Sequence, residues 1–546
     1  MRRALATLTM VFALALPAHA ERPRPLGWAM DAMRAGSWDN AALIARRDGA
    51  VAVDVIEWHR LRAGRGTYAE VTDFLRRRPD WPGEAYLRRQ SEEAVIREGD
   101  KAILDFFTGQ GPQTPEGVLA HAAALLRADR LGEAQARLVL AWRTLPMSGN
   151  DQAKFIDAHG PLLKPHHAAR LDEMLWQREH AEARQMFDLV SDADKALAET
   201  RIALQNLDGD VNALIDALPA SKAGDPGLQA DRFEWRIRKG YGDSAKDLML
   251  SQSVSAAALG QPAAWANRRR ALARDEMRNG DPARAYQMAS KHFLSEGSHF
   301  ADLEWLSGYI ALQFLKDPKL ALGHFQAHDG AVESPISQGR AGYWQGRAYQ
   351  AMGDAEGAAK AYAQGAKFQS SFYGLLAAER GNLPFDTSLA GAPPEQDWRT
   401  SALAQAPLFQ AGLLLQASGE LSTAERFWTH LAEQLITEDA ALLGQAAIDV
   451  GQPHLAVMIG KRVAQRGITI AGPYYALHDA IKLDLNMAPE MVLAIARRES
   501  EFDPVVQSHV GARGLMQLMP ATAKDVARDL EISALHTTDR LTADPE

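Results

Sequence analysis

Two adjoining stretches near the end of the chain carry most of its information: AIARRESEFDP at residues 494–504 and SHVGARGLMQLMPATA at residues 508–523. Pro489 suits the first turn of a helix, because the N–H that it lacks would have no partner there. Asp503-Pro504 stops that helix, since the residue before a proline is pushed out of the α region. Gly511 and Gly514 permit a tight turn. We therefore predict a helix from Pro489, a glycine turn and a second helix from Pro520.

Glu499 stands at the end of the first predicted helix. Val492, Ile495, Ala496 and Glu499 are spaced i, i+3, i+4 and i+7, the spacing of one helical face. This pattern predicts a carboxyl group on the buried face, in the last turn, where burial and the negative helix end would raise its pKa. Such a group suits general acid catalysis. Taken alone, Glu499 has a second interpretation as an ordinary helix-end glutamate or as a salt-bridge partner of Arg497 or Arg498.

The motifs together are more specific than Glu499 alone. Glu499-Ser500, Ser508, Gly511-Ala, Gly514-Leu-Met-Gln517 and Met519-Pro520 resemble the catalytic signature of the soluble lytic murein transglycosylases. The resemblance is tight over residues 490–525, and the helical region upstream is similar in order and layout. It implies a lysozyme-like helical domain that cleaves the β-1,4 bond between N-acetylmuramic acid and N-acetylglucosamine in peptidoglycan.

The resemblance also implies roles for four residues. Glu499 would be the sole acid and base, Ser508 would hydrogen-bond the sugar near it, Gln517 would contact polar groups of the substrate, and Met519 would form part of the cleft floor. Each of the last three has a plainer interpretation. Ser508 would bond turn backbone, Gln517 would be a solvated helix residue, and Met519 would be core.

The implied chemistry uses one carboxyl group, although most glycosidases use two. Glu501 and Asp503 lie near Glu499 in sequence, and we expect both to be solvated turn residues. In the family mechanism Glu499 protonates the leaving oxygen and then takes the proton of the muramic acid 6-hydroxyl, which attacks C1 and closes a 1,6-anhydro ring. Two alternatives stay open: a lysozyme-type hydrolase using the same glutamate, and a non-catalytic helical scaffold that binds peptidoglycan.

The upstream region predicts paired helices with small residues at their crossings. Gly346, Gly353, Ala358 and Tyr362 follow the spacing of a tetratricopeptide-like hairpin. A second set repeats this spacing, namely Gly412, Gly419, Ala424 and Trp428. Weaker copies start at Ala273 and Gly308. We predict an all-α fold in which a helical solenoid precedes a partial lysozyme-like domain. The resemblance implies that the superhelix closes into a ring.

We expect the aromatic and basic residues of the upstream region to have structural rather than ligand-binding roles. The twelve tryptophans all precede residue 430, and we expect most of them to pack between helices. The clusters Arg76–Arg78 and Arg268–Arg270 are interpreted as solvated faces rather than contacts for peptide carboxylates. His166-His167 lacks companion ligands, so we expect loop histidines, with no metal and no cofactor.

The N-terminus predicts export. Residues 1–20 have the basic, apolar and small-residue parts of a cleaved signal peptide, and the apolar run is shorter than the ~20 residues of a membrane span. The absence of cysteine excludes disulfides and thiol chemistry. Without Arg2 and Arg3, 58 of the 60 basic residues face 69 acidic ones, which disfavours nucleic acid as a partner. We expect a periplasmic protein whose partners are glycan strands and, as further candidates, cell-wall synthesis proteins.

Glycine and proline mark the expected boundaries. We predict a signal peptide at 1–20, an α-superhelical domain at 21–390, a helical linker domain at 391–470 and the N-terminal part of the catalytic domain at 471–546. The family resembled has further cleft motifs, an asparagine-and-glycine helix and a tyrosine-asparagine-alanine-glycine segment, that do not occur before Glu546. We therefore expect a truncated catalytic domain, and the sequence leaves the activity of this chain, its cleavage mode and its oligomeric state open.

Overall fold

Helices make up the regular structure of the chain, as predicted. The computed structural model describes residues 24–483, 487–534 and 537–543. Within these ranges every regular element is a helix, and extended pairing is confined to two isolated bridges, Gln507 with Arg513 and Arg513 with Leu518. The all-α fold class is therefore confirmed. The predicted signal peptide lies outside the described residues.

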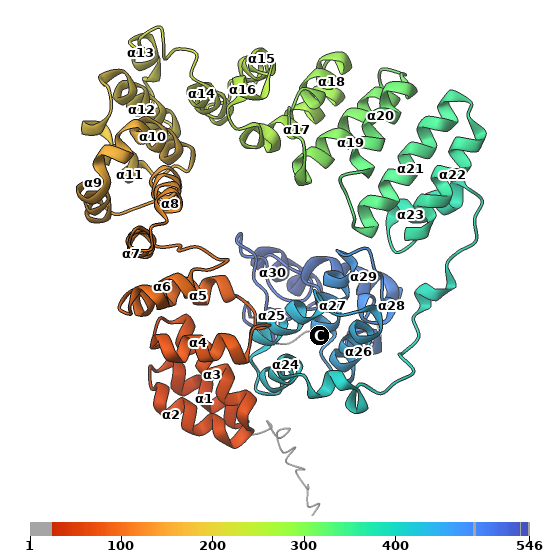
Figure 1. Cartoon of the computed structure of the whole chain (residues 1–546). Coiled ribbons are helices and arrows are strands. Elements are labelled where there is room, and N and C mark those ends of the chain that lie inside the picture. The colour runs from red at the N-terminus through yellow and green to blue at the C-terminus, as the bar shows by residue number, and fades with distance from the viewer. Residues whose placement is uncertain (1–23, 484–486, 535–536, 544–546) are drawn as a thin grey trace, which may run out of the picture.

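The longer part of the chain forms an arc of helices that pack one after another (Figure 1). These helices are α1 (Pro25–Arg34), α2 (Trp38–Ala45), α3 (Ala50–Arg62), α4 (Tyr68–Arg77), α5 (Glu84–Ile96), α6 (Asp100–Phe106), α7 (Pro115–Arg127), α8 (Leu131–Thr144), α9 (Gly149–Leu163), α10 (His167–Trp176), α11 (His180–Gln185), α12 (Asp192–Gln205), α13 (Val211–Asp216), α14 (Pro226–Arg238), α15 (Gly242–Gln252), α16 (Ala256–Leu259), α17 (Pro262–Asn279), α18 (Pro282–Ser290), α19 (Gly297–Gln313), α20 (Pro318–Asp329), α21 (Pro335–Met352), α22 (Ala355–Gly365) and α23 (Phe372–Arg380).

A second group of helices forms a block inside the arc (Figure 1). Its members are α24 (Pro407–Ala417), α25 (Leu421–Ala432), α26 (Thr437–Asp449), α27 (Pro453–Ala464), α28 (Ala471–Tyr474), α29 (Pro489–Ser500), α30 (Pro520–Asp529) and α31 (Arg540–Ala543). Short 3₁₀ turns join the helices, namely η1 (Arg46–Asp48), η2 (Lys164–His166), η3 (Phe187–Leu189), η4 (Ala366–Phe368), η5 (Thr387–Ala390), η6 (Trp398–Thr400), η7 (Ala402–Gln405) and η8 (Asp479–Lys482).

Several arc helices begin in the same way, with a capping side chain followed by proline. The cap oxygen accepts a hydrogen bond from a backbone N–H of the first turn, and the proline occupies a position whose N–H would be unpaired. This combination starts α7, α14, α18, α20 and α21, at Thr114-Pro115, Asp225-Pro226, Asp281-Pro282, Asp317-Pro318 and Ser334-Pro335.

The repeat positions predicted from spacing are the helix crossings. A Cβ added at Gly346 of α21 would lie 2.5 Å from the Tyr362 ring of α22, and one at Gly412 of α24 would lie 2.2 Å from Trp428 Nε1 of α25. The two glycines therefore let a large ring of the second helix rest on the backbone of the first. Since the two hairpins use equivalent positions, the predicted repeat is confirmed.

The arc closes into a ring because its first helices pack on α24 and α25. Phe427 lies between Trp58 and Trp81, with ring centroids 5.1 and 5.0 Å away. All three side chains are buried. At the rim of this contact Arg34 binds Glu420 at 2.8 Å. One buried cluster accordingly joins residues of the first hundred to residues beyond 398.

The other end of the arc also contacts the block. Tyr475, just after α28, donates a hydrogen bond to the Ser370 carbonyl before α23 at 3.1 Å, and the hydroxyl groups of Ser370 and Thr469 lie 3.3 Å apart. The closed ring implied by the resemblance is present (Figure 1). The helices α29 and α30 lie on the side of the block that faces the arc.

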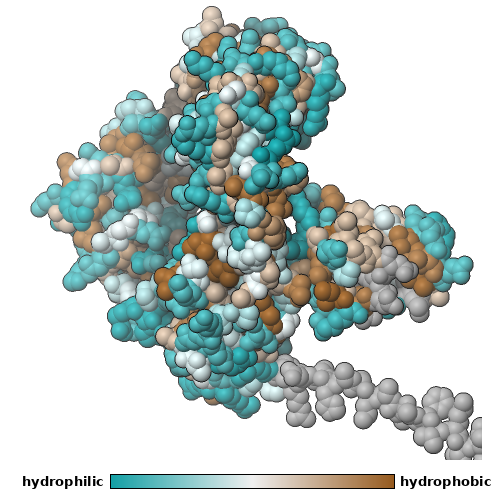
Figure 2. Space-filling view, turned by 90° about the vertical axis from the view of Figure 1, so that its right-hand side faces the viewer, coloured by the Kyte–Doolittle hydropathy of each residue, from teal (hydrophilic) through white to brown (hydrophobic). Residues whose placement is uncertain are grey.

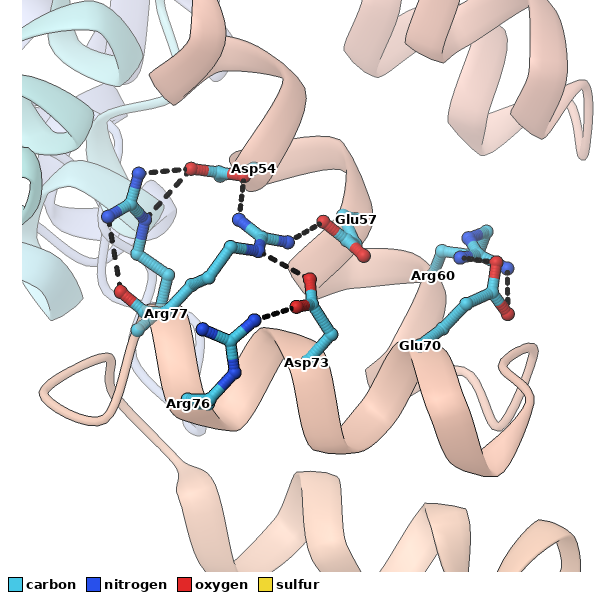
Figure 3. Close-up of polar contacts among 8 residues, drawn as sticks. Asp54, Glu57, Arg60, Glu70, Asp73, Arg76 and Arg77 are labelled. Carbon is cyan, nitrogen blue, oxygen red and sulfur yellow. Dashed lines mark hydrogen bonds and ion pairs between the residues drawn. The ribbon is translucent and has the colours of Figure 1, made fainter.

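The prediction that the arginine clusters are solvated faces holds for Arg76, whose side chain is 74% exposed, and is wrong for the other residues. Arg77 bridges Asp54 and Glu57 of α3 and Asp73 of its own helix α4, at 2.6–2.8 Å, while Arg78 also binds Asp54 (Figure 3). These groups join two helices. The second cluster behaves in the same way: Arg268 pairs with Glu234, Arg270 pairs with Asp302, and Arg269 is fully buried and bonds the Met288 carbonyl.

Most tryptophans pack in the core, as expected. The buried ones are Trp58, Trp81, Trp142, Trp265, Trp344, Trp398 and Trp428. His167, expected in a loop, begins α10 and packs 5.3 Å from the Trp142 ring. Viewed from the side, the surface mixes hydrophilic and hydrophobic residues around separate lobes (Figure 2). No helix of the described residues combines the length and hydropathy needed to cross a bilayer.

Candidate active site

Helix α29 presents Glu499 at its C-terminal end. The helix begins at Pro489 and ends at Ser500, as the proline pattern predicted. Its buried residues are Val492, Ala496 and Ser500. Glu499 itself is exposed, so the expected burial of this carboxyl group is wrong. The buried stripe runs through the small residues of the helix, and Ile495 is 38% exposed.

The alternative interpretation of Glu499 as a salt-bridge residue finds no support. The Glu499 carboxylate forms no ion pair with any residue that the structure describes. The neighbouring Arg497 donates to the Tyr474 carbonyl at 3.0 Å, and its guanidinium lies 4.6 Å from the Tyr474 ring centroid. Glu499 is therefore an exposed carboxylate at the helix end, as its interpretation as an ordinary helix-end glutamate describes, and Arg497 is engaged elsewhere.

Ser500 ties the end of α29 to the glycine turn. Its hydroxyl group is buried, lies 2.7 Å from the Leu515 carbonyl and accepts a hydrogen bond from Phe502 N at 3.1 Å. The backbones of Glu501 and Phe502 are both left-handed, with φ of 49° and 66°. Two such residues in succession are uncommon outside glycine. Ser500 had no separate role in the sequence interpretation, and its position beside Glu499 in the motif was the available signal.

The segment after α29 is held by α27. Lys461 binds the Glu501 carboxylate at 2.5 Å, and His454 Nδ1 lies 2.9 Å from the Glu501 carbonyl. Asp503 accepts a hydrogen bond from Val505 N at 3.0 Å. The expectation that Glu501 and Asp503 are solvated turn residues is therefore wrong for Glu501, whose carboxylate forms an ion pair.

His454 occupies a largely buried position between the Glu425 carboxylate and the backbone carbonyl of Glu501. Burial acts to lower its pKa, but a hydrogen bond with Glu425, 3.4 Å from Nε2, and the bond with the Glu501 carbonyl outweigh burial. The pKa of His454 is raised as a result. A protonated imidazole can donate at both nitrogen atoms, so it joins α25 to the turn that follows Glu499.

Ser508 begins the glycine turn between α29 and α30. Its hydroxyl oxygen accepts from Ala512 N at 2.9 Å, and its backbone N–H donates to the Ala512 carbonyl at 2.8 Å. This is the turn contact that the plainer interpretation describes. The hydroxyl proton is still available to donate to a ligand.

Gln517 and Met519 lie in the loop that leads into α30. The Gln517 amide nitrogen donates to the Val506 and Gly514 carbonyls at 3.1 and 3.0 Å, and its backbone has φ of 48°. Met519 precedes α30 at the N-cap position and is 42% exposed. An exposed methionine does not fit the core interpretation.

Gly514 is required by the turn itself. Its φ is 72°, and an added Cβ would lie 1.7 Å from the Leu541 carbonyl of α31. No other residue fits this position without moving backbone. The predicted close approach at Gly514 is confirmed, and it brings the loop that carries Gln517 against α31.

Comparison with known proteins connects this geometry to a family. Residues 477–546 match the model of the transglycosylase SLT domain. The soluble lytic murein transglycosylase of Escherichia coli K12 is 30% identical over 190 residues, which are 33% of this chain and 27% of that protein. The chain is therefore similar to soluble lytic murein transglycosylases over its C-terminal part, and it spans about a quarter of the length of this relative. A putative soluble lytic murein transglycosylase from Haemophilus influenzae is 27% identical over 167 residues, which are 30% of this chain and 28% of that protein.

Solved structures match the fold of this chain over nearly its whole length. An inactive glutamate-to-glutamine mutant of the lytic transglycosylase Slt from Pseudomonas aeruginosa has a TM-score of 0.64 and 19% identity, covering 96% of this chain and 85% of that one. The 70 kDa soluble lytic transglycosylase from Escherichia coli has a TM-score of 0.60 and 19% identity, covering 95% and 84%. These likenesses show that the helical ring is shared.

Proposed function

We propose that the protein is a peptidoglycan lytic transglycosylase that cleaves the bond between N-acetylmuramic acid and N-acetylglucosamine, with Glu499 as its single acid and base. The observation that carries the proposal is the exposed Glu499 at the end of α29, inside the segment that matches the SLT domain. The Pseudomonas relative is inactive as a glutamate-to-glutamine mutant, which supports a glutamate as the essential group.

The state of the neighbouring carboxyl groups supports a mechanism with one carboxyl. Glu501 is engaged by Lys461, which disfavours it as a nucleophile, and one oxygen of Asp503 is occupied by a backbone N–H. Protonated Glu499 donates its proton to the glycosidic oxygen as the bond from C1 to that oxygen breaks. The carboxylate then takes the proton of the muramic acid 6-hydroxyl, whose oxygen forms the new bond to C1. The sum is a 1,6-anhydro product, and no water is consumed.

The other proposed contributions come from the two turns. Ser508 has a hydroxyl proton left for a sugar oxygen, Gln517 has a free amide oxygen, and exposed Met519 offers an apolar surface at the start of α30. We assign peptidoglycan as the substrate and the periplasm as the compartment on the family resemblance. The division into a superhelical part to 390, a linker part to 470 and a catalytic part from 471 belongs to the same proposal.

The test is mass spectrometry of the products released from purified sacculi by the chain, by Glu499→Gln and by Glu490→Gln. Glu490 is also exposed and on α29, which makes it a matched control. We expect 1,6-anhydro-muropeptides from the chain and from Glu490→Gln, and a loss of about 10²-fold or more with Glu499→Gln.

Other results would point to the alternatives. Products with reducing ends would indicate a hydrolase that uses the same glutamate. Equal product from Glu499→Gln would contradict the assignment of the acid and base. Retention of the chain on sacculi without any product would favour the non-catalytic scaffold.

A further inference from the structure

A groove far from Glu499 in sequence lies along the arc. Side chains of α10, α12, α14 and α17 line a hollow of about 460 Å³, and a second hollow of about 150 Å³ adjoins it. The two share Arg178, Gln205, Asp231 and Glu234, so they form one continuous groove. These helices follow one another along the upper left part of the arc (Figure 1).

Most polar groups of the groove are already engaged within the protein. Asp231 is buried and accepts from Arg201 at 2.7 Å and from the Gln205 amide nitrogen at 2.9 Å. Glu234 forms a two-point contact with Arg268 at 2.8 and 3.0 Å. These carboxylates are therefore neutralised by arginines of neighbouring helices and do not repel an anionic ligand strongly.

Two arginines that line the groove have no hydrogen-bond or ion-pair partner of this kind. Arg178 follows α10 and contributes to both hollows, and Arg238 ends α14 and lines the smaller one. Both are exposed, and neither side chain makes a hydrogen bond or ion pair with the described part of the chain. Half-buried Trp176 provides an apolar wall beside them.

The contrast between the paired carboxylates and the two unpaired guanidinium groups indicates which kind of ligand the groove can bind. Hydroxyl groups of a neutral sugar need free donors and acceptors, and here Asp231, Glu234 and the Gln205 amide nitrogen are occupied. A guanidinium instead matches the planar, two-oxygen geometry of a carboxylate. In a chain whose formal net charge is −9, these two arginines, of which Arg178 also interacts electrostatically with buried Asp231, attract anions locally.

We propose that this groove binds the carboxylates of the short peptides attached to peptidoglycan glycan strands, an assignment that rests on the function proposed above. The peptide carboxylates contact Arg178 and Arg238, and the alkyl parts of the peptide lie against Trp176. Peptide binding on the ring holds a strand while its glycan part reaches α29 on the block.

Isothermal titration of the whole chain tests this proposal. The probes are a disaccharide muropeptide carrying its tetrapeptide, the same disaccharide without peptide, and inorganic phosphate. We expect the first probe to bind more tightly than the peptide-free disaccharide, which contacts only the site near Glu499, and we expect its affinity to fall about tenfold or more in the double variant Arg178→Gln/Arg238→Gln. Hydrogen exchange is expected to slow on binding in the segments 172–180 and 228–238.

The double variant Arg46→Gln/Arg47→Gln is a matched control. It removes two exposed arginines, whose side chains also lack a contact within the described residues, from a turn outside the groove. We expect it to bind the muropeptide like the unchanged chain. Equal weakening in both double variants, or equal binding of the peptide-free disaccharide or of phosphate, would overturn the proposal.

The outcome is independent of catalysis. Titration measures affinity and does not need bond cleavage. If Arg178→Gln/Arg238→Gln loses affinity for the peptide but still releases 1,6-anhydro products, the result would support the groove as a docking site. Conversely, muropeptide binding that depends on the two arginines in a chain that releases no product would contradict only the proposed activity.

Discussion

At the scale of single residues, Ser500 holds two backbone segments with one hydroxyl group. It is 3% exposed, bonds the Leu515 carbonyl and accepts from Phe502 N. We predict that Ser500→Ala lowers the free energy of unfolding by about 1–3 kcal/mol, because it leaves buried polar groups without partners. Urea unfolding measures this change.

Ser91→Ala is the matched control. Ser91 is also 3% exposed, but its hydroxyl bonds only the Leu87 carbonyl of its own helix, which keeps its ordinary helical bond in the variant. We expect a loss of less than about 1 kcal/mol. Equal losses in the two variants would mean that the link between α29 and the glycine turn adds nothing.

The exposure of Glu499 shows what single-sequence periodicity cannot decide. Two faces of α29 share the helical period, one through Ile495 and Glu499 and one through Ala496 and Ser500. Hydrophobicity favoured the first, but the glycine turn packs on the second and reaches Ser500 through Leu515. The motif predicted helix, turn and helix, whereas the choice of face depended on a neighbour that only the folded chain supplies.

At the scale of elements, α27 connects the linker helices to the turn after Glu499. Since the pKa of His454 is raised in the folded chain, protonation stabilises the fold. This contribution is fully present below the ordinary histidine pKa of about 6.5 and is lost as pH rises through the folded value. We predict that His454→Gln destabilises the protein more at pH 6 than at pH 9, as measured by unfolding at both values.

The control for this effect is His180→Gln, which removes a histidine whose hydrogen-bond partner is the neutral side chain of Gln205 at 2.7 Å. The pH dependence of the cost of His454→Gln is measured against it. A cost of His454→Gln that rises with pH would contradict the sign of the linkage.

Contacts between neighbouring helices could be predicted from the sequence, whereas ion pairs between more distant helices could not. The crossings of Gly346 with Tyr362 and of Gly412 with Trp428 lie within one hairpin, so local spacing predicted them. The partners of the arginine clusters lie on other helices: Arg268 binds Glu234, 34 residues away. Composition alone cannot show such pairings, and the clusters therefore looked like solvated faces.

At the scale of the whole molecule, ring closure depends on a small aromatic contact. Phe427 of α25 is fully buried against Trp58 and Trp81, and Arg34 with Glu420 adds a partly exposed ion pair. Packing of this kind brings together segments more than 340 residues apart. It fixes where α29 lies relative to the groove between α10 and α17, and the proposal that a strand held in the groove reaches α29 depends on that placement.

We predict that Phe427→Ala lowers the free energy of unfolding by about 3–5 kcal/mol and opens the ring. Small-angle X-ray scattering of the folded variant would show a larger radius of gyration. Phe325→Ala is the matched control, because Phe325 is equally buried but packs inside the arc, over Gly308 and near Trp344. It should cost a similar free energy without expansion. If Phe325→Ala expands the molecule as much as Phe427→Ala, or if neither does, the contact at Phe427 is not what keeps the ring closed.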